Sequence, residues 1–233
     1  MSKCSTISTA TYDRPLVWDA LGYEPFPWQV EHIHSRYEPR LILACGRRSG
    51  KSTAMVAEAW REALRPPEVV LGIRHAPLVY IVAPTYDLAD RIWLPLWRSS
   101  GMAGLEELVA NREKNPRRIT LHNGAVIQAK SADQPISLQG ERVTAAICEE
   151  SQSIEEMAWG ILMPSLLDSR GRLLSIGWPF GQGRFRSYWE RGQLREAEDA
   201  EGGGRFYSAS VPSTANPLLT EGDIAEMASD MTD

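Results

Sequence analysis

The octapeptide at residues 46–53, GRRSGKST, constrains the fold more than any other part of this 233-residue chain. It matches the pattern G-x-x-x-x-G-K-[ST], and the apolar run at 41–45 before it predicts a buried parallel strand. After it, Val56, Ala59, Trp60 and Ala63 recur at helical spacing and predict the buried face of a helix. A glycine-rich turn between a strand and a helix is the setting in which this pattern forms a phosphate-binding loop.

The chemistry of phosphate binding explains the spacing of the octapeptide. Its glycines let the backbone turn tightly, so that successive N–H groups point at phosphate oxygens, and the following helix adds its positive N-terminal end. Lys51 is then predicted to reach the β- and γ-phosphates of a nucleotide, and Ser52 to offer a hydroxyl to Mg²⁺. An ordinary glycine-rich turn with an exposed lysine is the alternative. The predicted nucleotide-binding residues of the loop are Gly46, Arg47, Arg48, Ser49, Gly50, Lys51, Ser52 and Thr53.

Charge and composition limit the class of protein. The 25 basic and 30 acidic residues give a net charge of −5, which argues against a broadly basic, phosphate-coating surface but leaves room for a local basic patch. The three cysteines, Cys4, Cys45 and Cys148, are widely spaced and odd in number, as expected of reduced thiols in a cytosolic protein. The chain has no apolar run of transmembrane length and no signal-peptide core, so we expect no membrane contact.

The segment upstream of the loop offers a candidate contact for the nucleotide base. Pro27 suits the first turn of a helix, and Trp28 and Gln29 follow it. A glutamine amide donates and accepts hydrogen bonds at once, which matches one edge of adenine, so Gln29 is a candidate adenine contact. A solvent-facing glutamine is the alternative. His32 and His34 lie two residues apart, point in different directions on a helix, and are expected to be surface residues rather than metal ligands.

Strands and helices alternate along the rest of the chain. Apolar runs at 78–83, 143–148, 173–177 and 205–211 predict further strands, and residues 66–77 are expected to form a loop. Asn123-Gly124 predicts the two-residue turn of a β-hairpin, preceded by a basic stretch at 111–118 that is either a solvated loop or a contact for DNA phosphates. The predicted fold is therefore α/β, a P-loop NTPase of the RecA/ASCE-like type, with a mostly parallel central sheet, helices on both faces and a β-hairpin insertion.

Two adjacent glutamates, Glu149 and Glu150, follow the apolar run at 143–148. A carboxylate pair at the end of a buried strand is what a phosphate loop needs opposite it, because one orients Mg²⁺ and the other polarises the attacking water. Glu149 is assigned to the metal, although aspartate is the usual residue there and glutamate is one methylene longer. Glu150 is assigned as the catalytic base. A merely charged strand end is the alternative.

Taken together, these motifs resemble the N-terminal ATPase domain of the large terminase subunit of tailed phages, the motor that packages DNA into capsids. The likeness rests on the order and spacing of several short segments. They are Pro27-Trp28-Gln29, residues 46–53, Ala83-Pro84-Thr85, the Asn-Gly hairpin with residues 131–135, Leu138-Gln139-Gly140, Glu149-Glu150-Ser151, residues 175–181 and Asn216-Pro217-Leu218-Leu219.

The resemblance implies further roles. Arg48, directly before the loop serine, would sense or stabilise the γ-phosphate, and Arg142 would complete the site of a neighbouring subunit in a ring. Ser175, Gly177 and Pro179 would correspond to the motif that couples hydrolysis to movement, although Ile176-Gly177-Trp178 departs from its usual form. ATP and Mg²⁺ are the expected cofactors. Double-stranded DNA, a portal protein that carries the homo-oligomeric ring and the small terminase subunit are the expected partners, in the host cytoplasm at the procapsid.

The expected domain organisation is a single P-loop ATPase domain over residues 1–233, with 1–14 flexible and the terminase nuclease domain absent, since no later carboxylate cluster could hold nuclease metals. Two other functions stay open. One is a helicase-like P-loop ATPase of another family, which strand separation of a tailed duplex would reveal. The other is a nucleotide-binding assembly module, which would bind ATP tightly with negligible turnover.

Overall fold

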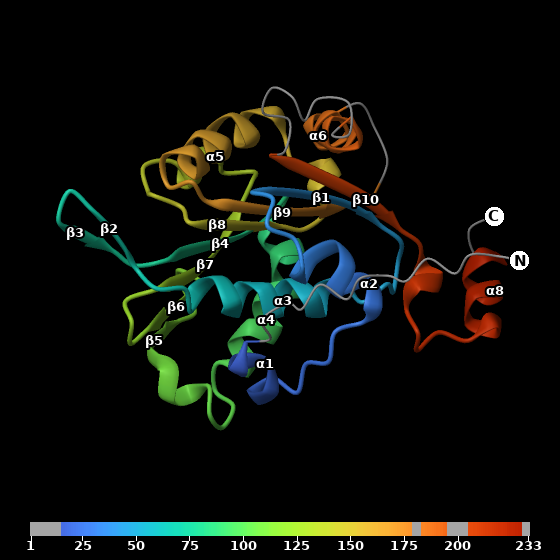
Figure 1. Cartoon of the computed structure of the whole chain (residues 1–233), viewed down its shortest axis with the longest axis horizontal. Helices are drawn as coiled ribbons and strands as arrows, with labels where there is room; N and C mark the ends of the chain where they lie inside the picture. The colour runs from blue at the N-terminus through green and yellow to red at the C-terminus, as the bar shows by residue number, and fades with distance from the viewer. Residues whose placement is uncertain (1–14, 179–182, 195–204, 230–233) are drawn as a thin grey trace, which may run out of the picture.

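The computed structural model describes residues 15–178, 183–194 and 205–229. Its centre is an eight-stranded sheet with the strand order β10-β1-β9-β8-β4-β7-β6-β5 (Figure 1). Six strands, from β10 to β7 in that order, are parallel, and β6 and β5 continue the sheet antiparallel. The strands are β1 (Arg40–Cys45), β4 (Leu78–Ala83), β5 (Val109–Glu113), β6 (Arg118–Leu121), β7 (Val126–Ser131), β8 (Ala145–Cys148), β9 (Arg172–Gly177) and β10 (Phe206–Val211).

Helices cover both faces of the sheet. Figure 1 shows α5 and α6 on one face and α3 and α4 on the other. The helices are α1 (Leu16–Ala20), α2 (Pro27–Gln29), α3 (Lys51–Ala63), α4 (Tyr86–Ser99), α5 (Glu156–Asp168), α6 (Arg184–Gln193) and α8 (Glu221–Ser229). Short π- or 3₁₀-helical turns lie at Val30–His34, Glu106–Leu108, Pro135–Leu138, Ser151–Ser153 and Ser213–Ala215. The predicted α/β P-loop fold is therefore confirmed.

Each face of the sheet has its own hydrophobic core. Along β1, Leu41 and Leu43 pack into the core beneath α3 and α4, whereas Ile42 packs into the core beneath α5 and α6. This alternation is what a pleated strand buried on both sides requires, and it explains why the run at 41–45 is apolar throughout. Trp60 of α3 and Trp159 of α5 are fully buried on opposite faces. Cys45 and Cys148 are buried free thiols, as predicted.

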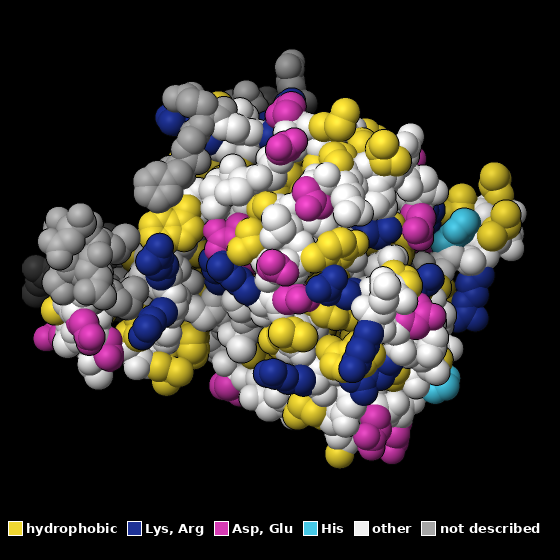
Figure 2. Space-filling view, turned by 180° about the vertical axis from the view of Figure 1, so that it is seen from behind, with side chains coloured by type: hydrophobic (Ala, Val, Ile, Leu, Met, Phe, Trp, Pro, Cys, Tyr) yellow, Lys and Arg dark blue, Asp and Glu magenta, His cyan; other side chains and the backbone are white. Residues whose placement is uncertain are grey.

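The segment at 66–77 differs from the predicted loop, because it folds into a second, two-stranded sheet. Strands β2 (Glu68–Val70) and β3 (Ile73–His75) pair antiparallel, and both turn residues, Leu71 and Gly72, have positive φ. Two strands of three residues are too short to show a period-2 pattern in the sequence. The hairpin projects from the molecule, and Figure 2 shows hydrophobic side chains at its outer end, where Leu71 is 96% exposed.

The predicted hairpin is confirmed, but its turn has three residues, 122–124, rather than the predicted two, because Leu121 N donates to the Ala125 carbonyl. Nor is it a separate insertion. Its second strand, β7, pairs parallel with β4 and thus belongs to the central sheet. The basic stretch at 111–118 lies partly in β5 rather than wholly in a loop. Thr85 caps α4 as its side chain accepts a hydrogen bond from the Leu88 N–H, and α4 continues through Pro95. In the described part of the chain, no helix is long and apolar enough to cross a bilayer.

Candidate nucleotide-binding site

The phosphate loop lies between β1 and α3 and depends on both of its glycines. A Cβ at Gly46 would lie 2.6 Å from Ser213 Oγ and 2.7 Å from Ser213 N, because this backbone runs directly against the turn after β10. Gly50 has a φ of +92°, in the left-handed region, and a Cβ there would lie 2.7 Å from the Phe26 ring. Both positions thus exclude a side chain: Gly46 because of the close approach of the backbone, and Gly50 because of close approach and its left-handed conformation.

Lys51 begins α3 and faces a cavity of about 610 Å³ at the carboxyl ends of the parallel strands. Ligands of open parallel sheets bind at this edge, where the strand order reverses. The cavity is lined by Arg47, Arg48, Lys51, Ser52, Leu88, Arg91, Glu149, Glu150, Gln152, Ser153 and Trp178. Six of the predicted site residues (Arg47, Arg48, Lys51, Ser52, Glu149 and Glu150) therefore meet around one space, although they come from two separate parts of the chain.

Glu149 is buried beside the lysine. Lys51 Nζ lies 3.4 Å from Glu149 Oε1, and the side chain of Glu149 is 1% exposed. Burial raises the pKa of Glu149 above its ordinary value, and the charge of Lys51 opposes this only in part. Apart from that ion pair, neither carboxylate oxygen has a hydrogen-bond partner among the described residues. Glu149 and Ser52 line the same cavity, and unused carboxylate lone pairs with a hydroxyl fit a hard divalent cation such as Mg²⁺.

Glu150 is held in a defined orientation at the cavity wall. Its φ of +49° lies in the left-handed region, which turns the side chain out of the strand direction. Arg91 Nη1 donates to Glu150 Oε1 at 2.7 Å, and Gln152 Nε2 donates to Oε2 at 2.8 Å. Burial alone would raise the pKa of Glu150, but the hydrogen bond from Gln152 and the charges of Lys51 and Arg91 outweigh it, so the pKa is below the ordinary value. Glu150 is thus ionised at neutral pH, as a general base must be.

Arg91, Gln152 and Trp178 are site residues that the sequence analysis missed. The side chain of Gln152 joins two parts of the site, since its Oε1 accepts a hydrogen bond from the Trp178 N–H at 3.0 Å while its Nε2 binds Glu150. The guanidinium of Arg47 lies 5.2 Å from the centre of the Trp178 ring. Their positions in the sequence could have indicated them, because each residue follows the carboxyl end of a predicted parallel strand.

The remaining residues of the loop differ in their contacts. The Ser49 hydroxyl is buried with no hydrogen-bond partner in the described chain. Thr53 Oγ1 donates to the Gly50 carbonyl at 2.8 Å. Thr53 lines a second, largely apolar cavity of about 760 Å³ that adjoins Ser52 on the side of residues 21–29. Asn216 Nδ2 donates to the Arg48 carbonyl at 2.6 Å, so the segment after β10 also contacts the loop.

Gln29 is buried, which rules out the alternative of a solvent-facing glutamine and leaves the adenine contact a prediction. Its residue is 1% exposed, its Nε2 donates to the Gly50 carbonyl at 2.9 Å, and its Oε1 accepts from the Phe26 N–H at 2.7 Å. The amide oxygen is thus already used, and the glutamine contacts the loop itself. Trp28 Nε1 likewise donates to the Ser49 carbonyl at 3.0 Å. The expectation that His34 is a surface residue is wrong, because its side chain is fully buried.

Arg142, Ser175 and Gly177 do not line the cavity. Arg142 pairs with Glu68 at 2.7 Å and precedes the amino end of β8, whereas the phosphate loop is at the carboxyl edge of the sheet. The Ser175 hydroxyl is buried in β9 without a partner in the described chain. A Cβ at Gly177 would lie 2.5 Å from Gln152 Oε1. Pro179 lies outside the described residues.

The order of the strands defines the class of this protein. The loop strand β1 and the acidic strand β8 are separated by one further strand, β9, and both end at the same cavity. A phosphate loop, an acidic strand one place removed and a glutamate beside the lysine are the features of a P-loop NTPase of the ASCE type.

Residues 42–162 match the family model described as "Terminase large subunit, T4likevirus-type, N-terminal", and the chain belongs to this family. The terminase large subunit of Thermus phage G20c is 30% identical over 202 residues, which cover 77% of this chain and 39% of that protein. The corresponding protein of Thermus virus P23-45 is 29% identical over the same extent. The chain thus spans 39% of the length of these curated relatives.

Solved structures show the same fold. The large terminase ATPase domain of Thermus phage P74-26 has a TM-score of 0.68 at 24% identity, with 87% of this chain and 86% of that chain covered. The large terminase of bacteriophage HK97 has a TM-score of 0.65 at 15% identity, covering 90% and 47%. The large terminase of a thermophilic bacteriophage, solved in complex with ADP, has a TM-score of 0.61 at 14% identity, covering 87% and 49%.

Proposed function

We propose that this chain is the ATP-hydrolysing part of a terminase large subunit and that it drives double-stranded DNA into a viral procapsid. Membership of the terminase family supports the packaging role. The observation that carries the proposal is the convergence of Lys51, Glu149 and Glu150, with Lys51 Nζ 3.4 and 3.6 Å from the two carboxylates. The ADP complex of the large terminase from the thermophilic bacteriophage supports a nucleotide in the cavity.

The side chains around the cavity have distinct roles in hydrolysis. The backbone of residues 46–50 and the start of α3 bind the phosphates, and Lys51 and Arg48 stabilise charge on the γ-phosphoryl group. Glu150, ionised and held by Arg91 and Gln152, accepts a proton from the attacking water. Ser52 and Glu149 would hold Mg²⁺, which supplies charge neutralisation between the phosphates when bound. Adenine lies against Gln29, whose second Nε2 hydrogen is its remaining donor.

The movement of DNA requires residues that couple hydrolysis to motion and contacts between subunits. Ser175, Gly177 and Pro179 act as the coupling segment, because β9 ends beside the cavity and Gln152 links Trp178 to Glu150. Arg142 completes the site of the next subunit in a ring that assembles on a portal protein, with the small terminase subunit as a further partner. Residues 1–233 act as one ATPase domain, in the host cytoplasm at the procapsid.

The substitution Glu150→Gln tests the catalytic assignment. It preserves the size of the side chain and one of the two accepted hydrogen bonds but removes the base, so ATP turnover is expected to fall by about 10²- to 10⁴-fold while binding of ATP-γ-S is retained. Glu155→Gln, an exposed glutamate shortly after in the chain, is the matched control and should keep the parent rate. Turnover by the Glu150 variant at the parent rate would disprove the role of the base. A parent protein that binds ATP without turnover would point to an assembly module.

A further inference from the structure

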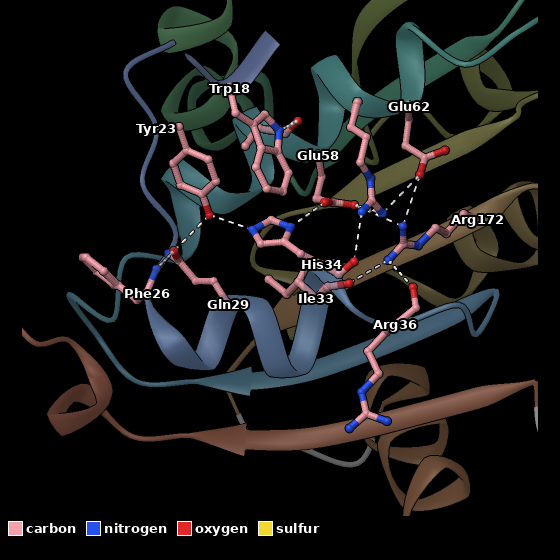
Figure 3. Close-up of polar contacts among 12 residues, drawn as sticks. Trp18, Tyr23, Phe26, Gln29, Ile33, His34, Arg36, Glu58, Glu62 and Arg172 are labelled. Atoms are coloured by element: carbon pink, nitrogen blue, oxygen red, sulfur yellow. Dashed lines mark hydrogen bonds and ion pairs between the residues drawn. The ribbon is translucent and has the colours of Figure 1, made fainter. Parts of the chain in front are cut away.

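A line of buried polar side chains runs from the phosphate loop to the first residue of β9 (Figure 3). In order, it contains Gln29, Tyr23, His34, Glu58 and Arg172. Each of these residues is at most 8% exposed, and the first four lie on the segment upstream of β1 and on helix α3. We call this line the buried relay. Because buried polar groups are costly unless each is satisfied, such a line specifies the position of every member.

The loop end of the buried relay has a fixed direction. The Phe26 N–H can only donate and the Gly50 carbonyl can only accept, so the Gln29 amide must direct Oε1 to Phe26 and Nε2 to Gly50. Tyr23 is then obliged to donate its hydroxyl proton to Gln29 Oε1, at 2.9 Å. A hydroxyl has one proton. The Tyr23 oxygen must therefore accept from its other neighbour, His34 Nε2, at 2.7 Å.

His34 carries this direction on to Glu58. Its Nε2 has to bear a proton, and its Nδ1 lies 2.7 Å from Glu58 Oε1. The other oxygen of Glu58 is 2.7 Å from Arg61 Nη2 and 3.2 Å from Arg172 Nη1, so two guanidinium groups hold this carboxylate in place. The ring of His34 is thus held at both nitrogens, between Tyr23 and Glu58. The ring also packs on Trp18, with centroids 4.3 Å apart.

We propose that His34 is a positioning residue for nucleotide binding, acting through Tyr23 and Gln29 on the carbonyl of Gly50. The inference rests on the proposed function, because it assumes that the loop binds ATP. The backbone N–H groups that receive phosphate belong to a turn whose one end is Gly50, with a φ of +92°. A hydrogen bond from Gln29 to that carbonyl restrains the turn before the nucleotide arrives, so part of the ordering cost of binding is already met.

The buried relay also connects the loop to β9. Arg172 Nη2 donates to the carbonyls of Ile33 and Arg36, at 3.0 and 3.3 Å, and so fixes the π-helical turn that carries His34. The strand that begins with Arg172 ends at Gly177, beside the cavity. The position of His34 therefore depends on the same strand that contains the proposed coupling residues.

Two substitutions at His34 separate positioning from simple stability. In His34→Gln, the side-chain amide nitrogen can occupy the place of Nε2 and still donate to Tyr23. In His34→Asn, the shorter amide takes the place of Nδ1 and keeps only the contact with Glu58. Both replace the imidazole ring by an amide. The dissociation constant of ATP-γ-S is expected to increase about 3- to 10-fold in His34→Asn and to stay within about 2-fold of the parent in His34→Gln, as for one buried hydrogen bond.

Tyr23→Phe interrupts the buried relay without changing the ring that packs on Trp18, and it should weaken ATP-γ-S binding as much as His34→Asn. The double variant should bind no more weakly than either single one, because both break the same line. The KM for ATP is expected to increase with kcat unchanged. Ser99→Ala is the control, since Ser99 accepts a buried hydrogen bond from Trp60 Nε1 on α3 but is not hydrogen-bonded to any member of the buried relay.

Equal binding by the two His34 variants, or parent-like binding by Tyr23→Phe, would overturn the proposal. Tyr23→Phe provides this test even if both His34 variants unfold. Thermal unfolding of every variant identifies a merely structural effect, which should appear equally in Ser99→Ala. If the parent protein neither binds ATP-γ-S nor hydrolyses ATP, the proposed function is wrong. If the parent binds ATP-γ-S and the variants bind it equally well, only the role of the buried relay is wrong.

Discussion

Glu149 and Glu150 are neighbours in the chain, yet the structure gives them opposite electrostatic environments. Burial raises the pKa of Glu149, whereas the hydrogen bond from Gln152, with Lys51 and Arg91, overcomes burial and lowers the pKa of Glu150. Pairs of carboxyl groups whose pKa values are driven apart are typical of sites that divide metal binding and base catalysis between two residues. The two adjacent glutamates thus differ because the side chain of Glu149 is almost fully buried and that of Glu150 is more exposed, which suits the metal and base roles proposed for them.

A third glutamate, Glu62, predicts a measurable dependence of stability on pH. Burial raises its pKa to about 7, and Arg65, whose side chain is 56% exposed and hydrated, offsets this only in part. Glu58 lies nearby and raises the pKa further, while Arg61 lowers it. The folded protein holds the proton more tightly than the unfolded chain does. The contribution of Glu62 to the free energy of unfolding is therefore present below pH 4.5 and is lost as the pH rises to about 7.

Glu62→Gln removes this dependence because glutamine does not titrate. The free energy of unfolding of Glu62→Gln minus that of the parent is expected to increase by on the order of 1–3 kcal/mol between pH 5 and pH 8. Urea denaturation at several pH values measures it, and groups that titrate in both proteins cancel in the difference. A difference that does not change with pH would contradict the raised pKa.

At the scale of elements, close packing of α6 on the edge strand β10 depends on Gly192. A Cβ at this position would lie 2.5 Å from Ser208 Oγ and 2.7 Å from Ser208 N. The same serine donates from Oγ to the Trp189 carbonyl and accepts at its own carbonyl from Gln193 Nε2. The helix therefore lies directly on the backbone of the strand, and a methyl group has to separate them.

Gly192→Ala should consequently lower the free energy of unfolding by about 1–3 kcal/mol, the usual cost of overpacking. Gly160→Ala is the matched control in α5, since it is exposed and has nothing within 4 Å of the added carbon. It should raise stability by up to about 1 kcal/mol, because alanine is the better helix former. Denaturant unfolding of both variants measures the two changes in the free energy of unfolding. Equal changes would show that α6 can move away from β10 without cost.

At the scale of the whole molecule, the position of Arg142 bears on assembly. It lies before the amino end of β8, at the edge of the sheet opposite the phosphate loop, and it pairs with Glu68 at the base of the β2–β3 hairpin. Because of this separation, it can serve an ATP site only in another subunit. A contact of this head-to-tail kind closes a ring when the rotation between subunits permits it.

ATP turnover per subunit is expected to rise with protein concentration as subunits associate. Arg142→Ala should abolish the rise while ATP-γ-S binding stays intact, and Glu68→Ala should preserve or strengthen it by releasing Arg142. Arg186→Ala, which removes an exposed arginine paired with Glu190 on α6, is the control. A constant, non-zero rate across concentration would mean that one chain holds a complete site.

Local signals explain how much of the molecule is visible in the sequence. The strand–loop–helix setting of Gly46 to Thr53, the apolar parallel strands and the two glutamates after β8 all lie within short windows, so their pattern alone predicts the α/β fold and the edge of the sheet where the site forms. Asn123-Gly124 likewise marks the position of the hairpin, because its conformational preferences are local, although the turn has three residues and not two.

Only the tertiary structure decided which side chains from distant segments meet. Arg91 reaches Glu150 from α4, and Gln152 joins Glu150 to the end of β9. His34 is buried although its residue type and spacing suggest the surface, because Tyr23, Glu58 and Trp18 from three other segments surround it. The physical reason is common to all of them: hydrogen bonds and burial between segments depend on the packed geometry of the whole sheet and its helices, which no short window of sequence contains.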